Sequence, residues 1–254
     1  MVEITVSKFT KRFGAKTVHR GVSFELEKGQ CMGLIGGSGS GKSVLLRSLI
    51  GLEHPDSGDV IVKGQNVREL DEKGMIELRK KVAYVFQGGA LFDSMSVYDN
   101  LAYPLREHTT RSESEIAINI RAVLESFGLS GNESLFPADL SGGMQKRLGL
   151  ARAIILKPDI VLYDEPTAGL DPFNTRKIQE MILSLKKQGV TSILVTHDMP
   201  SAFAVCDRIA LLVEGTIQAH SNCANGTSTD EFIQRFAQGE DLAAIKETMG
   251  AERL

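Results

Sequence analysis

The hydrophobic and polar positions near the start of the chain predict short strands. Residues 3–9 alternate between apolar and polar side chains, and residues 21–26 form a second run of this kind. A turn at 27–29 separates the second run from an unbroken apolar run at 31–35. A further strand is expected at 59–62, after a turn that contains proline and glycine. The early part of the chain is therefore expected to be rich in strands.

Apolar runs later in the chain lack this alternation. They lie at 82–86, 160–164 and 191–195. An unbroken apolar run suits a parallel strand that is covered on both faces, as in α/β sheets. Apolar residues recur at helical spacing around 144–155 and 178–185, so helices are expected there.

The segment from residue 90 to about residue 140 becomes helical in pattern and is expected to be an insertion in the sheet core. After a hairpin at 208–219, residues 221–229 are polar and are expected to form a loop. Apolar residues then recur at helical spacing in the tail: Phe232, Ile233, Phe236, Leu242, Ile245 and Met249. They either pack back on the core or bind a partner, and the pattern favours neither.

Composition narrows the class of protein. A hydrophobic fraction of 42% and a charged fraction of 24% are ordinary for a soluble globular chain of 254 residues, which allows one large domain or a core with a subdomain. The net charge of −3 gives no reason to expect nucleic acid as a partner. The three cysteines, Cys31, Cys206 and Cys223, lack the spacing of a zinc site or a disulfide framework.

Membrane and export signals are also missing from the pattern. No apolar run approaches the roughly 18 residues that span a bilayer, and the first residues lack the basic and apolar regions of a signal peptide. We therefore expect a cytosolic chain whose membrane role, if it has one, comes through a partner.

One glycine-rich stretch between the strand at 31–35 and the following helix carries the strongest chemical signal. It matches G-x-x-x-x-G-K-[ST] over eight consecutive residues: Gly36, Gly37, Ser38, Gly39, Ser40, Gly41, Lys42 and Ser43. Glycines let successive backbone N–H groups surround a phosphate, and a helix starting near Val44 adds its positive end. Lys42 would reach the β- and γ-phosphates, and the Ser43 hydroxyl would bind Mg²⁺. A flexible Gly/Ser loop is the alternative, but both flanks favour a nucleoside triphosphate site.

Polar residues stand at the ends of three predicted buried strands. Asp164 would hold Mg²⁺, directly or through water, and Glu165 could polarise an attacking water. His197 follows the strand at 191–195 and would lie at the same sheet edge, where a γ-phosphate contact is expected. Gln87 follows the strand at 82–86, which alone is weak evidence for a site.

A second helix start has the features of an anion site. Ser141 suits the N-cap position, and Gly142 and Gly143 leave the first backbone N–H groups bare. A plain capped helix start is the alternative interpretation.

Taken in order, these motifs resemble those of the ATP-binding cassette ATPases over about residues 3–220. The matching motifs are Phe13 for the A-loop aromatic, 36–43 for Walker A, Gln87 for the Q-loop, 140–144 for the signature, 160–165 for Walker B, 168–171 for the D-loop and His197 for the switch histidine. The resemblance implies an α/β fold with a RecA-like P-loop NTPase core, an antiparallel β subdomain and an inserted helical subdomain at about 88–156. It also implies an ATPase domain at 1–220 with a C-terminal extension at 221–254 that contacts a partner or a second copy.

The same resemblance implies the roles of the site residues. Phe13 would stack on adenine, although a phenylalanine in a small β core is an equal reading of this residue alone. Glu165, His197 and Gln87 would serve catalysis, and Ser43, Gln87 and Asp164 would hold Mg²⁺. ATP would lie between two copies of the chain, bound by residues 36–44 of one copy and by Ser141, Gly142 and Gly143 of the other.

A narrower resemblance covers residues 86–109, which together with the signature LSGGM are similar to the ATPase subunit of Mla/Mce-type lipid transporters. It implies a membrane permease as partner, glycerophospholipid as the moved substrate, and a peripheral position on the cytoplasmic face of the inner membrane. A STAS-domain subunit and an MCE-domain lipid-binding protein are the further partners that it implies. Residues 218–223 depart from the pattern, since they lack its glycine-containing end.

The segment 87–106 is unusually apolar for a surface connection: Leu91, Phe92, Met95, Val97, Tyr98, Leu101, Tyr103 and Leu105. About half of these would fill the core of the helical insertion, and the rest would form a groove for a helix of the permease. Phe92 and Tyr98 are expected to be exposed.

Other function classes fit the sequence less well. A soluble cassette ATPase of translation usually has two cassettes, and this chain has one Walker A motif. An SMC-type ATPase needs a long coiled coil between its motifs, and a regulator without hydrolysis would not need Glu165 and His197. An importer ATPase for a different small substrate remains the main alternative.

Overall fold

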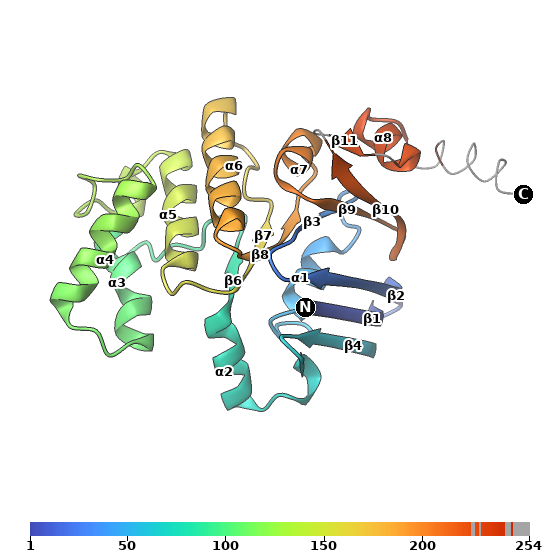
Figure 1. Ribbon diagram of the computed structural model, residues 1–254, viewed down its shortest axis with the longest axis horizontal. Coiled ribbons are helices and arrows are strands. Elements are labelled where there is room, and N and C mark those ends of the chain that lie inside the picture. Colours follow the sequence, from blue (N-terminus) through green and yellow to red (C-terminus); the bar gives the residue numbers. More distant parts are fainter. Residues whose placement is uncertain (225–226, 229, 242–244, 246–254) are drawn as a thin grey trace, which may run out of the picture.

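The computed structural model describes residues 1–224, 227–228, 230–241 and 245. Two sheets organise these residues: a four-stranded antiparallel sheet in the order β2-β1-β4-β5 and a seven-stranded sheet in the order β11-β10-β9-β3-β8-β7-β6. Figure 1 shows the small sheet beside the core and the helices α3, α4 and α5 at the opposite end of the molecule. The fold is thus α/β with an added antiparallel sheet and a helical region, as predicted.

The small sheet is built by the alternating part of the chain. Its strands are β1 (Val2–Phe13), β2 (Lys16–Glu27), β4 (Ser57–Val62) and β5 (Gln65–Asn66). β1 and β2 are longer than the alternation predicts, because the polar residues near their shared turn pair across the hairpin as far as Phe13 and Lys16. Ile4, Val6 and Phe9 line the buried face, and each is at most 1% exposed.

The large sheet contains the unbroken apolar runs. Its strands are β3 (Cys31–Ile35), β6 (Val82–Val85), β7 (Ile160–Asp164), β8 (Thr191–Val195), β9 (Arg208–Val213), β10 (Thr216–Ala224) and β11 (Thr227–Ser228). β9, β3, β8, β7 and β6 are parallel neighbours, and all residues of β3, β7 and β8 are buried. This confirms parallel strands covered on both faces. Their carboxyl ends meet at one edge of the sheet.

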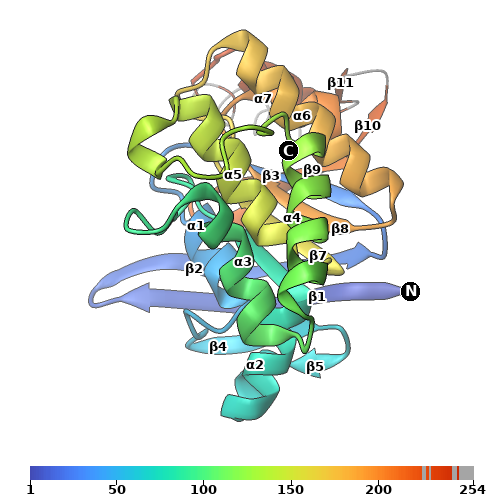
Figure 2. The ribbon, with the colours of Figure 1, turned by 90° about the vertical axis from the view of Figure 1, so that its left-hand side faces the viewer.

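Helices cover the large sheet and extend it. They are α1 (Lys42–Ser48), α2 (Glu72–Lys81), α3 (Val97–His108), α4 (Glu113–Ser126), α5 (Gly142–Ile154), α6 (Pro172–Lys187), α7 (Met199–Val205) and α8 (Glu231–Ala237), with short 3₁₀ turns at Val67–Glu69 and Pro137–Asp139. Figure 2 looks onto α3, α4 and α5, which fall within the predicted helical insertion at 88–156. Treating this stretch as a separate subdomain stays a prediction.

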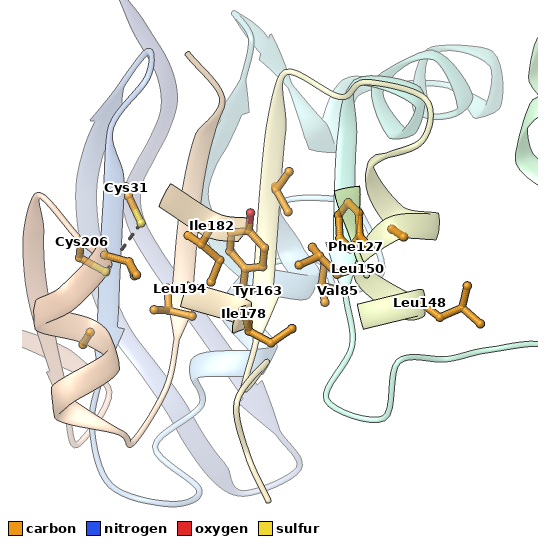
Figure 3. Packing of buried hydrophobic residues seen from close by; sticks show 14 of the residues in the cluster. Cys31, Val85, Phe127, Leu148, Leu150, Tyr163, Ile178, Ile182, Leu194 and Cys206 are labelled. Carbon is orange, nitrogen blue, oxygen red and sulfur yellow. Dashed lines mark hydrogen bonds between the residues drawn. The ribbon is translucent and has the colours of Figure 1, made fainter. Parts of the chain in front are cut away.

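One core joins the helices to the sheet. Tyr163 on β7 is fully buried, and it belongs to the same cluster as Ile178 and Ile182 of α6 and Leu150 of α5. Figure 3 shows these side chains packed between the strands and the covering helices. The end of β7 that carries Asp164 therefore follows a fully buried, closely packed residue.

Two of the helices, α2 and α7, were not predicted from the pattern. α2 begins at Asp71, whose carboxylate accepts a hydrogen bond from the Gly74 backbone N–H at 2.7 Å, and it buries only Met75 and Leu78 among its ten residues. α7 has seven residues. α2 is too polar and α7 too short to show a repeating apolar pattern. In each case the sequence signal for the start of the helix was its capping residue.

The prediction of a polar loop at 221–229 is wrong for its described part. Residues 221–224 continue β10, where Ser221 pairs with Ile209 and Asn222 with Arg208, and Thr227–Ser228 forms β11. Backbone pairing along β9 satisfies the N–H and C=O groups whatever the side chains, and this outweighs the polar composition. β10 also crosses the predicted boundary at residue 221.

The tail packs back on the core where it is described. Phe232 and Ile233 of α8 are buried in the large cluster, and so is Ile245. Leu242 and Met249 lie outside the described residues. None of the helices in the described part of the chain is both long and apolar enough to cross a membrane.

Candidate functional site

The glycine-rich loop joins β3 to α1 in a conformation that requires glycine at two positions. Gly36 has a φ of 153°, and a Cβ there would lie 2.3 Å from the Leu212 carbonyl oxygen. Gly41, the N-cap of α1, has a φ of 99°, and a Cβ there would lie 2.6 Å from Val18. Both contacts exclude any larger residue, so the loop is packed tightly against the strands beneath it.

Lys42 is held inside this loop. Its Nζ donates hydrogen bonds to the carbonyl oxygens of Gly36 at 2.9 Å and Gly37 at 3.0 Å. Burial lowers the pKa of Lys42, while the carboxylates of Glu165 and Asp164 act in the opposite direction. The ammonium group is thus fixed at the loop with two carboxylates near it.

The carboxylate of Asp164 is buried at the end of β7. Its Oδ1 accepts a hydrogen bond from the Ser43 hydroxyl at 2.8 Å, and its Oδ2 accepts one from the Tyr84 hydroxyl at 2.7 Å. Burial, and then the Asp164 carboxylate, raise the pKa of Tyr84, so its hydroxyl stays a donor. The structure joins Ser43 to Asp164 as predicted and adds Tyr84, which no motif indicated.

Glu165 and His197 form a pair at the same edge of the sheet. Oε2 of Glu165 lies 2.9 Å from Nδ1 of His197, and the backbone N–H of Glu165 donates to the Val195 carbonyl at 2.9 Å. Glu165 has a φ of 51°, in the left-handed region, which costs a non-glycine residue about 1–3 kcal/mol. The Glu165 side chain is 15% exposed and the His197 side chain 71%. The carboxylate is therefore largely sheltered from solvent and contacts an exposed imidazole.

A cavity of about 570 Å³ lies over these residues. It is lined by Phe13, Lys16, Val18, Ser38, Gly39, Gly41, Lys42, Ser43, Val44, Gln87, Glu165, Val195 and His197. Ten of these were predicted from the sequence as site residues, whereas Lys16, Val18 and Val195 belong to none of the motifs. Gly36, Gly37 and Ser40 belong to the loop but are not in the lining, and Asp164 lies behind Ser43. The volume is within the range of small-ligand and cofactor pockets.

Two residues of the small sheet lie close to this cavity, Phe13 in its lining and His19 behind Gly41. Phe13 is 46% exposed, with the Lys11 ammonium 4.9 Å from its ring centroid, so it does not fill the core of the small sheet. His19 is fully buried behind Gly41, and burial lowers its pKa to about 4. The exposed ring of Phe13 is free to contact a ligand at the rim.

The helix start at Ser141 lies apart from this cavity. The hydroxyl of Ser141 caps α5 by accepting from the Met144 backbone N–H at 3.3 Å, and residues 141–143 do not line the cavity among the described residues. A Cβ on Gly143 would lie 2.5 Å from the side chain of Asn174, which accepts a hydrogen bond from Arg147 at 2.7 Å. The chain therefore presents two separate candidate anion sites, one at the loop and one at α5.

A second cavity, of about 670 Å³, lies between α4, α5 and α6 at the opposite end of β7. Val123, Phe127, Ile155 and Met181 contribute to its lining. None of the predicted site residues lines it, so it has no part in the site described above.

Comparison with known proteins identifies the family. The sequence model described as ABC transporter matches residues 19–168, which include the glycine-rich loop, the helix start at Ser141 and the end of β7. The chain belongs to the ABC transporter family. It is the ATP-binding and ATP-hydrolysing subunit that defines this family. Phe13 and His197 lie outside the matched range.

Relatives of this ABC ATPase cover nearly the whole chain. The probable ribonucleotide transport ATP-binding protein mkl of Mycobacterium leprae is 43% identical over 96% of the chain and 71% of its own length. The intermembrane phospholipid transport system ATP-binding protein MlaF of Escherichia coli K12 is 35% identical over 94% of the chain and 89% of its own length.

Solved structures agree with the fold. The dimeric ATP-binding cassette MJ0796, in a post-hydrolysis state with ADP and phosphate, has a TM-score of 0.81 and 28% identity and covers 87% of this chain and 99% of its own. The same TM-score and coverage hold for a second dimeric structure of that bacterial ABC transporter cassette. The RecA-like cassette fold of the ABC ATPase is therefore confirmed.

Proposed function

We propose that this ABC ATPase hydrolyses MgATP to drive phospholipid transport between two membranes. The observation that supports phospholipid as the substrate is the similarity to MlaF, which extends over 94% of the chain and 89% of the relative. The mkl relatives, named for ribonucleotide transport, are 43–44% identical and support the second candidate substrate.

The donors at the loop fit a magnesium ion. The Ser43 hydroxyl, the Asp164 carboxylate and the Gln87 amide offer oxygen ligands, which Mg²⁺ prefers together with substrate phosphates and water. No cluster of three or more His, Cys, Asp or Glu side chains suited to a metal occurs among the described residues. A bound Mg²⁺ would neutralise charge on the phosphates.

The other groups around the cavity have separate roles in ATP binding and hydrolysis. Backbone N–H groups of residues 36–44 and the Lys42 ammonium bind the phosphates, and Phe13 stacks on the adenine at the rim. Glu165 accepts a proton from the attacking water, because its sheltered carboxylate is the acidic side chain that lines the cavity. His197 holds Glu165 in place through Nδ1 and contacts the γ-phosphate.

Two copies of the chain complete each site in this proposal. The helix start formed by Ser141, Gly142 and Gly143 lies outside the cavity of its own chain, so it is available to the ATP of a second copy. The dimeric cassettes among the structural relatives support this arrangement. ATP would then hold the two copies together, and hydrolysis would release them.

We expect Ser141→Arg to prevent dimer formation while leaving ATP binding by the monomer intact. The substitution places a cation at the positive end of α5 and fills the space where the second phosphate contact forms. ATP affinity measured by titration calorimetry and ATP-dependent dimerisation measured by light scattering would separate the two effects. Ser130→Arg, which adds the same bulk and charge at an exposed position outside both sites, is the matched control. An equal loss of monomer binding in Ser141→Arg would place Ser141 in the same site as Lys42, against the proposal.

The permease would dock beside the segment that follows Gln87. Phe92 and Tyr103 are each 41% exposed and meet edge to face, with ring centroids 5.3 Å apart, while the Arg152 guanidinium lies 4.8 Å from the Phe92 ring centroid. The core members of the segment are Val97, Leu101 and Leu105, which are fully buried. Tyr98 was expected to be exposed, and this is wrong: it is half-buried and packs against the core cluster. The exposed pair is thus Phe92 and Tyr103.

We expect Phe92→Ala to spare ATP binding by the isolated subunit but to weaken its assembly with the permease and to lower lipid transfer in proteoliposomes. The Phe92 ring is partly exposed and contacts Tyr103 and Arg152, so its removal should leave the isolated chain folded, whereas aromatic residues contribute strongly at interfaces. Ile118→Ala, which removes a side chain 67% exposed on α4, is the control. Normal assembly and transfer by Phe92→Ala would show that this surface does not couple the two subunits.

The substrate is tested on the assembled transporter. Purification of the tagged chain with its membrane partners, followed by reconstitution, should give ATP-dependent movement of labelled glycerophospholipid. Movement of ribonucleotides without phospholipid would instead support the function named for the mkl relatives. The proposal places the chain at the cytoplasmic face of the inner membrane, with a permease, a STAS-domain subunit and an MCE-domain lipid-binding protein expected among the copurified proteins.

A further inference from the structure

The hydroxyl of Tyr84 has no part in the motifs of this site, yet it contacts the carboxylate proposed to bind magnesium. Tyr84 lies on β6, next to β7, and donates to Oδ2 of Asp164 at 2.7 Å. Ser43 donates to the other oxygen, Oδ1, at 2.8 Å. Each oxygen of the buried carboxylate therefore has one hydrogen-bond donor, and the two donors come from different elements, β6 and α1.

Two donors fix a group that one donor would leave free to turn. Rotation of a carboxylate about its last bond is soft, with no sharply preferred angle. With Ser43 alone, the Asp164 carboxylate could swing about the Oδ1 contact. With the Tyr84 hydroxyl bound to Oδ2 as well, the rotation of the Asp164 carboxylate is fixed. Mg²⁺ requires near-octahedral geometry at short distances, so the angle of this carboxylate decides how well it binds the ion or its water.

We infer that Tyr84 is a positioning residue for the metal, which acts by holding Oδ2 of Asp164 so that the Oδ1 side, beside Ser43, faces the ion. This inference rests on the proposed magnesium site. Hydrogen-bond partners that orient metal ligands typically change metal affinity by about 10–100-fold when they are removed.

The surroundings of Tyr84 allow its hydroxyl to be removed without disturbing the packing. Its ring packs against Phe86, with centroids 4.4 Å apart, and belongs to the edge of the core under the small sheet. Tyr84→Phe keeps this ring contact and deletes only the hydroxyl. Tyr163→Phe is a closely matched control, because Tyr163 is fully buried on β7 beside Asp164, and its hydroxyl has no hydrogen-bond partner in the described part of the chain.

Binding of Mn²⁺ by the full chain saturated with ADP, followed by electron paramagnetic resonance, tests the inference without hydrolysis. We expect Tyr84→Phe to weaken Mn²⁺ binding about tenfold, to leave ADP affinity in EDTA unchanged, and to lower the unfolding midpoint by several degrees at most, because one buried acceptor loses its donor. Tyr163→Phe should bind Mn²⁺ as wild type does. In the Asp164→Asn background, Tyr84→Phe should have no further effect on Mn²⁺, because the carboxylate it orients is gone.

Three results would overturn the inference. Unchanged Mn²⁺ affinity in Tyr84→Phe would show that the hydroxyl only satisfies a buried carboxylate. A loss of ADP affinity in EDTA would show that it shapes the loop and not the metal site. An equal effect of Tyr84→Phe with and without the Asp164 carboxylate would show that it acts by another route. A wild-type chain that binds no ADP at all would instead overturn the proposed nucleotide site, and the inference with it.

Discussion

Replacing Lys42 with alanine should weaken MgATP binding by at least about 100-fold, because hydrogen bonds from a charged donor contribute about 1.5–3 kcal/mol each. In the structure the ammonium group is already placed at the loop, where it donates to Gly36 and Gly37. Bound phosphates would replace these carbonyl oxygens as stronger, charged acceptors. The alanine variant loses this cation, while the backbone N–H groups of the loop remain. Titration calorimetry with ATP and Mg²⁺ measures the loss.

The control for this experiment is Lys187→Ala, which removes an exposed lysine from the end of α6, outside the cavity. It should bind MgATP as wild type does. If Lys42→Ala also binds ATP with wild-type affinity, the glycine-rich loop is not the phosphate site.

Glu165→Gln should lower ATP turnover by about 10²–10⁴-fold, the usual loss when a general base is removed. Glutamine keeps the size of the side chain and can still hydrogen-bond to His197, which lies 2.9 Å from Oε2 in the wild-type chain. The amide cannot accept a proton from water. ATP should therefore bind and persist, so the variant should form an ATP-dependent dimer that light scattering detects, whereas the wild type with ADP should stay monomeric.

Phosphate release gives the rate, and Glu180→Gln on the exposed side of α6 serves as the matched control. Turnover at the wild-type rate by Glu165→Gln would exclude Glu165 as the base. If Glu165→Gln loses both turnover and ATP binding, Glu165 contributes to ATP binding, and its assignment as the general base alone is wrong.

The local chemistry of the site could be predicted from short stretches of sequence. The glycine-rich loop needs glycine at Gly36 and Gly41 because the strands beneath leave no room for a Cβ, and this requirement appears directly in the residue types. The unbroken apolar runs that precede Asp164 and His197 identified buried parallel strands, since burial on both faces removes alternation. Because parallel strands end at one edge, the sequence also placed Lys42, Glu165 and His197 near one another.

Contacts between elements that are distant in sequence could not be predicted in this way. The hydrogen bond from Tyr84 to Asp164 joins residues 80 positions apart, and nothing in the strand around Tyr84 distinguishes this tyrosine from any other half-buried aromatic residue. His19 behind Gly41 is a second such case. The exposure of Phe92 and Tyr103 and the burial of Tyr98 depend on how α3 packs on its neighbours, which helical spacing alone left undecided.

The sequence by itself determined the fold class, the positions of the buried strands along the chain, the glycine-rich loop and the acidic strand end, because each depends on residues within a few positions of one another. Only the tertiary structure decided that residues 221–224 extend a strand, that α8 packs on the core, and that both oxygens of Asp164 are held. The physical reason is the range of the forces involved. Backbone sterics and burial periodicity act along the chain, whereas strand pairing and side-chain hydrogen bonds join partners that only the folded chain brings together.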